Sequence, residues 1–198
     1  MSNILIIYAH PKTPKSFNQD LLQTLTSHLE SQNHEIKIRD LYAQHFQSHL
    51  TTDDLIALHS NTTPMDIQEE QNYIIWANTI IFIYPIWWAS APAIMKGYFD
   101  RILAYGFAYK IENGQTKGLL TDKKAIIINS TGTPYDTYER LGFYRAMQFL
   151  TDTGIFEFCG FKKISHLFYG GTPTATQDTI QTYIINAIKI TDKFIAEN

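Results

Sequence analysis

Two consecutive tryptophans, Trp87 and Trp88, lie between a buried apolar run and a helix, where they could bind a ligand. Pro85 ends the run because a proline cannot extend a central strand, and Pro92 suits the first turn of the helix. The pair therefore lies at the carboxyl end of a strand, where open α/β sheets bind ligands. Two large aromatic side chains there indicate a flat, apolar ligand. The alternative, that both belong to the core, suits one tryptophan better than two in succession.

The segment from His10 to Asn18 leads from the first apolar run into a helix and is suited to a phosphate group. A helix start presents free backbone N–H groups and a positive partial charge. Ser16 and Asn18 can add hydroxyl and amide contacts, and Thr13 or Lys15 can assist. Neither a Walker sequence nor GxGxxG is present, so neither a P-loop NTPase nor a Rossmann dinucleotide site is predicted. For Ser16 the alternative, that it only caps the helix, is equally good.

A third loop, residues 129–135, follows another apolar run and is rich in small hydroxyl residues and turn formers. Alone it could be an ordinary connection between a strand and a helix. The loops that follow parallel strands meet at one edge of the sheet, however, so this loop is expected beside the other two. Three such loops at one edge form a stronger candidate binding site than any of them alone.

The elements that must position these loops alternate between strand and helix. Continuous or alternating apolar runs predict strands, and apolar residues at helical spacing predict amphipathic helices. The predicted strands cover 4–8, 35–40, 79–84, 125–129 and 164–169, and the predicted helices cover 17–32, 66–76, 92–104 and 141–158, with a last helix that carries Ile180 to Ile195 on one face. Residues 41–65 predict a long irregular loop with one helical turn near 53–59, of the kind that acts as a lid or a subunit contact.

Five short strands alternating with helices predict a three-layer α/β sandwich with a five-stranded parallel sheet. Neither an internal repeat nor a linker interrupts the chain, so residues 1–198 are expected to form a single domain. The single cysteine, Cys159, excludes an intramolecular disulfide and is expected to be buried and inert.

Composition and charge exclude several classes of protein. The formal net charge is −3 and the sequence pI is about 6.1, with Lys and Arg scattered, which argues against nucleic-acid binding. The apolar stretch Thr79–Met95 is interrupted by Pro85 and Pro92, so we expect no membrane insertion. The amino terminus carries no basic region or cleavage site, which predicts a cytoplasmic protein.

The remaining histidines lack the spacing of metal ligands, with neither HxH nor HExxH present. They are therefore expected on the surface or in loops, and no metal site is predicted. These residues are His28, His34, His45, His49, His59 and His166.

Four stretches of the chain together resemble the NAD(P)H:quinone oxidoreductase family. They are His10…Ser16-Phe17-Asn18, the long stretch Tyr84-Pro85-Ile86-Trp87-Trp88…Pro92-Ala93-Ile94-Met95-Lys96-Gly97-Tyr98-Phe99-Asp100-Arg101, then Gly106-Phe107-Ala108-Tyr109, and Cys159-Gly160-Phe161. The long stretch is the most specific of the four. This family consists of flavodoxin-like flavoproteins and includes mammalian DT-diaphorase, bacterial general-stress NAD(P)H oxidoreductases and the ancillary flavoproteins of glutathione-gated potassium efflux.

The resemblance implies one flavin, FMN or FAD, per subunit, and it assigns residues to that flavin. His10, Ser16, Phe17 and Asn18 would hold the phosphate and ribityl side, while Pro85, Ile86, Trp87 and Trp88 would lie against the isoalloxazine, with Trp88 as the flavin-facing tryptophan. Ser130, Thr131, Gly132 and Thr133 would bind the polar edge of the ring, and Tyr109 would line the substrate pocket. A flavin needs an apolar wall and donors near N1 and O2, where charge accumulates on reduction, and these residue types provide both.

The chain departs from the family pattern at two places. DT-diaphorase has a tyrosine and a histidine that are implicated in charge relay during hydride transfer. Counting back from Cys159 puts Tyr135 at the tyrosine position but Leu141 at the histidine position, so Tyr135 is left as the candidate catalytic residue. Residues 41–65 are also shorter than the corresponding segment of the FAD-binding mammalian enzymes, which leaves both FMN and FAD open.

The resemblance therefore implies an NAD(P)H oxidoreductase that reduces quinones or related acceptors by ping-pong hydride transfer and forms a homodimer. Because the donor would leave before the acceptor arrives, such an enzyme needs no separate dinucleotide domain. One alternative is a flavin-binding ancillary subunit that regulates a potassium-efflux-type transporter through peripheral association with it. The other is a flavodoxin-like electron carrier, although flavodoxins are strongly acidic and the net charge here is only −3.

Overall fold

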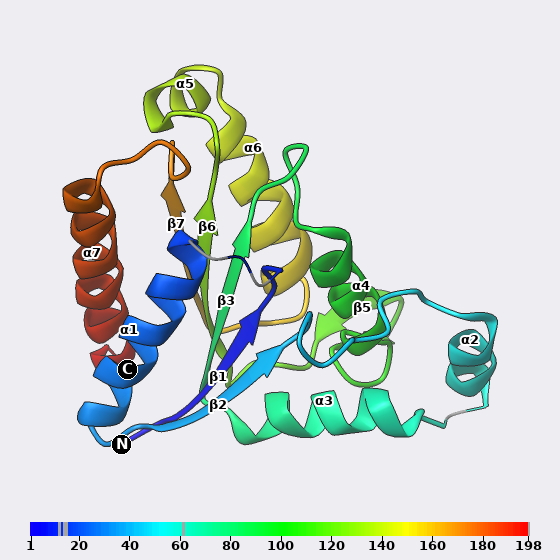
Figure 1. The fold of residues 1–198 in the computed structure, drawn as a ribbon. Helices are drawn as coiled ribbons and strands as arrows, with labels where there is room; N and C mark the ends of the chain where they lie inside the picture. Colours follow the sequence, from blue (N-terminus) through cyan, green and yellow to red (C-terminus); the bar gives the residue numbers. More distant parts are fainter. Residues whose placement is uncertain (12, 14–15, 61, 198) are drawn as a thin grey trace.

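The computed structural model describes residues 1–11, 13, 16–60 and 62–197, and its centre is a parallel sheet of five strands (Figure 1). The strands are β1 (Asn3–Tyr8), β2 (Glu35–Asp40), β3 (Thr79–Pro85), β6 (Lys124–Ser130) and β7 (Lys163–Tyr169), and they lie side by side in the order β2-β1-β3-β6-β7. All four pairings are parallel. The predicted α/β sandwich with a five-stranded parallel sheet is therefore confirmed.

Helices cover both faces of this sheet because successive residues of each central strand point to opposite sides. On one face, Ile4, Ile6, Ile81, Ile83, Ile126 and Ile128 pack against α1 (Phe17–Ser31) and α7 (Gln177–Ala196). On the other, Leu5, Ile7, Ile80, Phe82 and Ile127 pack against α3 (Met65–Trp76), α4 (Ala93–Ile102) and the segment around Phe156. None of the helices within the described ranges is long and apolar enough to cross a membrane.

The excursion between β2 and α3 contains more helix than predicted. Instead of one turn near 53–59, α2 (Thr52–His59) is an eight-residue helix that begins at a capping box, in which the side chains and backbone N–H groups of Thr51 and Asp54 pair reciprocally. Arg101 ties this excursion to α4: its guanidinium donates to both Asp54 carboxylate oxygens, at 3.0 and 2.9 Å, and to the Gln47 carbonyl at 2.9 Å.

Two further segments differ from the prediction. Residues expected to form a loop form a hairpin of β4 (Tyr109–Glu112) and β5 (Gln115–Gly118), turned at Asn113-Gly114, where both residues have positive φ. The helix expected over 141–158 is instead two pieces, α6 (Phe143–Gln148) and the π-helix η1 (Phe149–Glu157), and a short helix that was not predicted, α5 (Tyr135–Arg140), precedes them. The break falls at Gly142, whose φ of 75° ends α5.

Candidate functional site

The three loops singled out in the sequence meet at the carboxyl edge of the sheet, at the upper end of the strands in Figure 1. Backbone hydrogen bonds join the residue that follows each strand to the neighbouring strand of the sheet. Ala9 N–H donates to the Ile83 carbonyl at 3.0 Å, and Ile86 N–H donates to the Ser130 carbonyl at 2.8 Å. Thr131 N–H donates in turn to the Tyr169 carbonyl at 2.9 Å. The exit of β7 therefore belongs to the same edge as the three predicted loops.

A cavity of about 620 Å³ lies between the start of α1 and the start of α7. It brings together most of the residues predicted to hold a phosphate, namely His10, Thr13, Ser16, Phe17 and Asn18, with Ser130 from the third loop. Lys15 lies outside the described residues. The sequence reasoning missed the other residues that line the cavity, which are Asp20, Thr172, Pro173, Ala175, Gln177 and Ile180. The signal for Thr172 and Pro173 was present, because Gly170-Gly171-Thr172-Pro173 follows the last strand at the same edge of the sheet.

Ser16 occupies the N-cap position of α1, but its side chain makes no capping hydrogen bond. Its hydroxyl instead lies 3.4 Å from each ring nitrogen of His10, whose Nδ1 is 2.7 Å from the Pro11 carbonyl. Ser16 is therefore the N-cap residue, as the alternative had it, but it caps the helix through its backbone carbonyl and not through its hydroxyl. The hydroxyl faces the cavity residues, and the start of α1 keeps its positive end open toward an anion.

Asn18 supplies the clearest indication that the cavity is built for a polar group. The side chain is 2 % exposed, and its Nδ2 donates to Ser130 Oγ at 3.0 Å. Its Oδ1 is buried and has no hydrogen-bond partner within the described part of the chain. A buried amide oxygen without a donor is costly in a folded protein, so a bound hydroxyl or amide would complete this site.

The tryptophan loop, residues 85–90, is a tight turn whose two indole rings lie outside the hydrophobic core. Trp87 and Ser90 exchange two backbone hydrogen bonds, of 3.0 and 3.1 Å. Between them, Trp88 and Ala89 have φ of 51° and 57°, a left-handed conformation that is unfavourable for residues other than glycine. Trp88 is fully exposed, and the Trp87 ring centroid lies 6.5 Å from that of His10. The alternative that both tryptophans are core residues is therefore wrong.

Ile86 and Pro85 form the base of this loop. Pro85 is buried as the last residue of β3, and Ile86 lines a smaller cavity of about 290 Å³ with Ala89, Ser90 and, across from them, Leu150 of η1. This smaller cavity is distinct from the one lined by His10 and Ser16. The loop thus approaches His10 through Trp87 on one side and faces η1 on the other.

The third loop is held by side-chain as well as backbone bonds. Thr131 is buried, its Oγ1 donates to the Thr133 carbonyl at 2.8 Å, and it lies 3.2 Å from the Tyr144 hydroxyl. Because the Thr131 N–H is taken by Tyr169, it is not available to a ligand. The amides of Gly132 and Thr133 make no hydrogen bond among the described residues, so these two are the backbone donors that the loop can offer.

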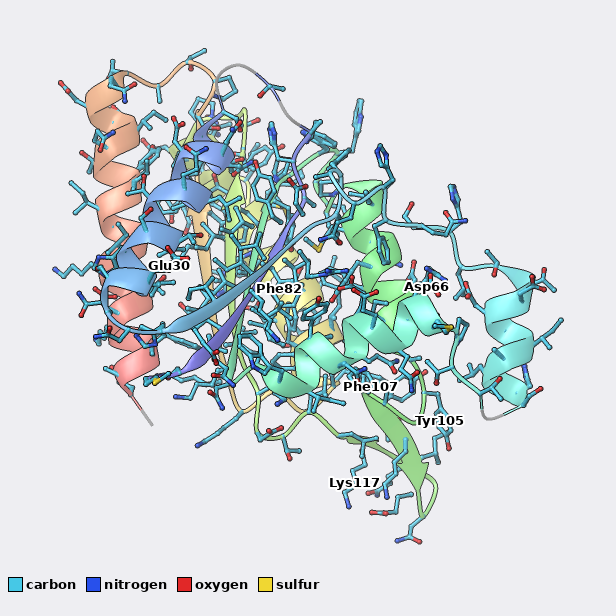
Figure 2. The ribbon with its side chains drawn as sticks, turned by 60° about the horizontal axis from the view of Figure 1, so that its bottom comes forward. Glu30, Asp66, Phe82, Tyr105, Phe107 and Lys117 are labelled. Carbon is cyan, nitrogen blue, oxygen red and sulfur yellow. The ribbon has the colours of Figure 1, made fainter. Side chains whose placement is uncertain are left out.

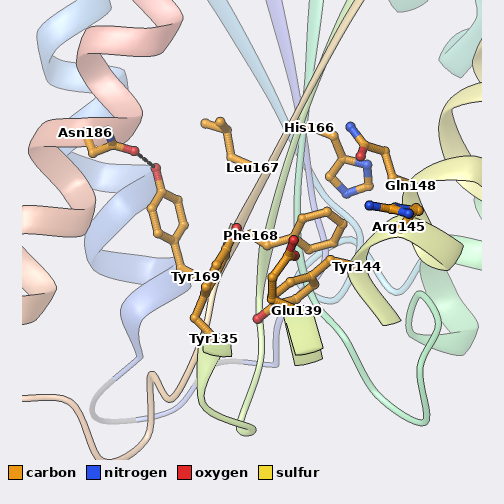
Figure 3. A pocket seen from close by; sticks show the side chains of 10 residues that line it. All are labelled: Tyr135, Glu139, Tyr144, Arg145, Gln148, His166, Leu167, Phe168, Tyr169 and Asn186. Atoms are coloured by element: carbon orange, nitrogen blue, oxygen red, sulfur yellow. Dashed lines mark hydrogen bonds between the residues drawn. The ribbon is translucent and has the colours of Figure 1, made fainter. Parts of the chain in front are cut away.

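Tyr135 and Tyr109 do not share a cavity with the other predicted residues. Tyr135 begins α5, its ring lies tilted against that of Tyr144 with centroids 4.9 Å apart, and it lines a separate cavity of about 520 Å³ beside β7, shown in Figure 3. Tyr109 lines a fourth cavity, of about 560 Å³, between α2, α3 and the segment around Tyr105. Within one chain, these two tyrosines are therefore separated from the cavity lined by His10 and Ser16.

Two sequence expectations about single residues have opposite outcomes. Cys159 is buried as expected, and burial raises the pKa of its thiol to about 11, so the thiol is unreactive at neutral pH. His166, expected on the surface or in a loop, instead lies within β7 with its side chain 1 % exposed. Its ring nitrogens lie 2.8 Å from Asp152 Oδ1 and 2.7 Å from Asn129 Oδ1. No motif spacing reveals this contact, because the partners come from three different elements.

Comparison with known proteins gives concordant matches over nearly the whole chain. The family model described as "Flavodoxin-like fold" matches residues 2–189. An uncharacterized NAD(P)H oxidoreductase of Haemophilus influenzae is 34 % identical over 168 residues, covering 85 % of this chain and 83 % of that protein. Ribosyldihydronicotinamide dehydrogenase [quinone] of Rattus norvegicus is 30 % identical over 195 residues, covering 88 % of this chain and 84 % of that protein. The structure of an NAD(P)H:quinone oxidoreductase from Methanothermobacter marburgensis superposes with a TM-score of 0.85 at 28 % identity, covering 95 % of this chain and 94 % of that one.

Proposed function

The chain belongs to the flavodoxin-like NAD(P)H:quinone oxidoreductase family, and on that premise we propose that it is a flavin-dependent enzyme that reduces quinones or related acceptors with NAD(P)H. When bound, the flavin would accept a hydride from NAD(P)H and deliver it to the acceptor by a ping-pong sequence. The observation that carries the proposal is the cavity beside α1, where the unpartnered Oδ1 of Asn18 and the open N-terminus of the helix meet.

The residues of this cavity fit the phosphate and ribityl side of FMN or FAD. The positive end of α1 and the Ser16 hydroxyl attract and bind an anion, and Asn18 Oδ1 accepts a hydrogen bond from a sugar hydroxyl. His10 and Phe17 line the same cavity and exclude water from one side. We therefore assign His10, Ser16, Phe17 and Asn18 to this half of the cofactor.

The two neighbouring loops fit the ring system. We assign Trp88, with Pro85, Ile86 and Trp87 of the same turn, to the apolar wall, because an exposed aromatic side chain held on a left-handed backbone is poised to stack on a flat ligand. The loop of Ser130, Thr131, Gly132 and Thr133 then donates to the polar edge of the ring through the amides of Gly132 and Thr133. Tyr135 adds a hydroxyl donor at the start of α5.

We also propose that the enzyme is a cytoplasmic homodimer and that the substrate pocket is completed by the partner. The cavity lined by Tyr105 and Tyr109 is also lined by Leu50 and Leu55 of the excursion, and Tyr105, Leu50 and Leu55 are all exposed. Tyr105, labelled in Figure 2, lies against Tyr109 at the start of the β4–β5 hairpin. Exposed apolar and aromatic side chains gathered around one groove are typical of an interface. This arrangement accounts for the separation of Tyr109 from the cavity lined by His10 and Ser16 within one chain.

The relatives favour an enzyme over the two alternatives. The matched proteins of Haemophilus influenzae, Rattus norvegicus and Methanothermobacter marburgensis are named as oxidoreductases or dehydrogenases, rather than as transport subunits or electron carriers. An enzyme of this class turns over many equivalents of donor and acceptor, whereas a regulatory subunit or a carrier does not require turnover.

The proposal is tested on the purified protein in two steps. Its absorption spectrum and the mass of any released cofactor identify FMN or FAD, and steady-state turnover of NADH and NADPH with a benzoquinone establishes the reaction. We expect parallel lines in double-reciprocal plots, as for a ping-pong enzyme. A protein without flavin absorption that binds neither FMN nor FAD on titration would contradict the proposal.

A further inference from the structure

A buried polar network runs from η1 across two strands to the exit of β3. His166 Nδ1 lies 2.8 Å from Asp152 Oδ1, and its Nε2 lies 2.7 Å from Asn129 Oδ1. Asn129, which is fully buried, donates through Nδ2 to the Tyr84 carbonyl at 3.1 Å. Tyr84 immediately precedes Pro85, so the network ends at the base of the tryptophan loop.

The directions of these hydrogen bonds fix the orientation of the Asn129 amide. The Tyr84 carbonyl can only accept, so it fixes Nδ2 of Asn129 on its side and turns Oδ1 toward His166. Both ring nitrogens of His166 therefore lie within hydrogen-bonding distance of an acceptor oxygen, one on Asp152 and one on Asn129. A buried contact between a histidine and a carboxylate is not a strong source of stability, since desolvation offsets much of the attraction.

A second arm starts from the same ring and reaches the third loop. The His166 ring stacks on Phe168, with centroids 4.1 Å apart and planes inclined by 23°. Phe168 stacks in turn on Tyr144, at 4.4 Å and 26°. The Tyr144 hydroxyl lies 3.2 Å from Thr131 Oγ1, which itself donates to the Thr133 carbonyl. Figure 3 shows His166, Phe168 and Tyr144 following one another along one side of β7.

We propose that His166 is a positioning residue that fixes two loops of the cofactor site at once, the tryptophan loop through Asn129 and the loop of Thr131–Thr133 through Phe168 and Tyr144. The proposal rests on the proposed function, because it assigns these loops to flavin. The buried contact of His166 with Asp152 and the π-helical segment that carries Asp152 then serve the geometry of the site, and π-helical turns are often found at functional sites.

The two arms, one hydrogen-bonded through Asn129 and the other stacked through Phe168 and Tyr144, can be tested separately with two variants. The double variant His166→Phe with Asp152→Leu keeps an aromatic ring against Phe168 and leaves no buried charge unpaired, so we expect it to fold. It removes the hydrogen bond between His166 and Asn129 and preserves the stacked arm. Tyr144→Phe does the opposite, because it removes only the hydroxyl that contacts Thr131. A surface pair, His28 and Asp192, provides the matched control His28→Gln with Asp192→Asn.

Amide hydrogen exchange in the full-length protein without added flavin reads out each arm. In the double variant we expect the Ile86 and Trp87 amides to exchange about tenfold faster, as for one lost hydrogen bond, with Thr131 unchanged. In Tyr144→Phe we expect the reverse: the Thr131 amide exchanges faster than in the wild type, and the exchange rate of the Ile86 amide is unchanged. Unchanged exchange in both variants, or a uniform increase over the whole sheet, would overturn the proposal.

Titration with FMN then links the positions of the loops to the cofactor. We expect each variant to bind FMN about tenfold more weakly than the wild type, and the control to bind equally well. Variants that bind FMN as tightly as the wild type would show that His166 does not position the site. A wild-type protein that binds no flavin would contradict the proposed function, while the exchange pattern would still decide whether His166 holds the two loops.

Discussion

At the scale of single residues, Trp88 combines two features that are costly unless they serve a ligand. Its backbone adopts a left-handed conformation, and its side chain is fully exposed to water. A non-glycine residue in this region is strained, and an exposed indole gains nothing from the hydrophobic effect. A flat apolar ligand that covers the ring removes the indole from water, and the free energy of that contact offsets the strain of the backbone.

We expect Trp88→Ala to weaken flavin retention while leaving the fold intact. A stacked aromatic pair contributes about 0.5–1.5 kcal/mol beyond the burial of area, so the Kd for flavin rises at least several-fold. Fluorescence titration with FMN and thermal unfolding measure the two effects. Ile185→Ala, which truncates another exposed apolar side chain, is the control. A substitution of Trp88 that leaves the Kd unchanged would remove this residue from the flavin wall.

Tyr135 is the residue for which we expect only a modest effect on catalysis. Leu141, at the position of the relay histidine, is exposed and cannot donate a proton, so the donors left are the Tyr135 hydroxyl and the amides of Gly132 and Thr133. Tyr135→Phe should therefore slow flavin reduction by NAD(P)H only a few-fold, because the backbone donors persist. Stopped-flow absorbance measures this rate. An unchanged rate would exclude the tyrosine from the reaction.

At the scale of elements, Arg101 holds the α2 excursion against α4 through a buried ion pair. Its guanidinium, hydrogen-bonded to the Asp54 carboxylate, lowers the pKa of that carboxyl to about 2. A carboxyl whose pKa is lower in the folded than in the unfolded state stabilises the fold above its unfolded pKa, near 4. That stability is lost as the pH falls from about 4 toward 2, and it amounts to about 2 kcal/mol.

We expect Asp54→Asn to abolish this part of the pH dependence. Urea unfolding at pH 7 should show the variant to be less stable than the wild type by at least about 2 kcal/mol, with the difference shrinking toward pH 2. The control is Asp192→Asn, at an exposed ion pair, where little change is expected. A wild-type stability that stays level between pH 4 and pH 2 would show that the pair does not have this role.

The secondary-structure elements differ in how well the sequence alone predicts them. The five strands can be predicted to within a residue or so. The central ones are apolar runs that the sheet buries, as in Ile4–Ile7 and Ile126–Ile128, whereas the largely exposed β2 is recognised by its alternation of apolar and charged residues. The hairpin β4–β5 was missed because its residues are largely polar and exposed, although Asn113-Gly114 is a strong turn signal. The π-helix η1 was taken for α-helix because side-chain spacing over nine residues does not distinguish the two.

The site was predictable only where it depends on local sequence. His10, Ser16 and Asn18 come together because one strand exit leads directly into one helix, and that local geometry can be read from the chain. The contact of His166 with Asp152 and Asn129 depends on the register of β6 and β7 and on the winding of η1. These are tertiary features, and no pattern in a single sequence encodes them.

At the scale of the whole molecule, we expect a homodimer. Sedimentation should give a species of twice 22.8 kDa at micromolar concentration, and Tyr105→Glu should shift it toward the monomer, because a charge in an apolar interface is poorly tolerated. Ile185→Glu, far from that groove on α7, serves as the control. A monomer of 22.8 kDa with full activity would contradict the dimer and the shared substrate pocket.

The strand order leaves β2 and β7 at the two margins of an open sheet, where unpaired backbone groups can recruit a strand from another molecule. β2 carries Glu35, Lys37, Arg39 and Asp40, so an approaching strand would meet charges of both signs. β7 is flanked by Arg145 and Gln148 of α6. Charged side chains on β2, and the α6 residues beside β7, therefore disfavour the addition of a further strand at either margin.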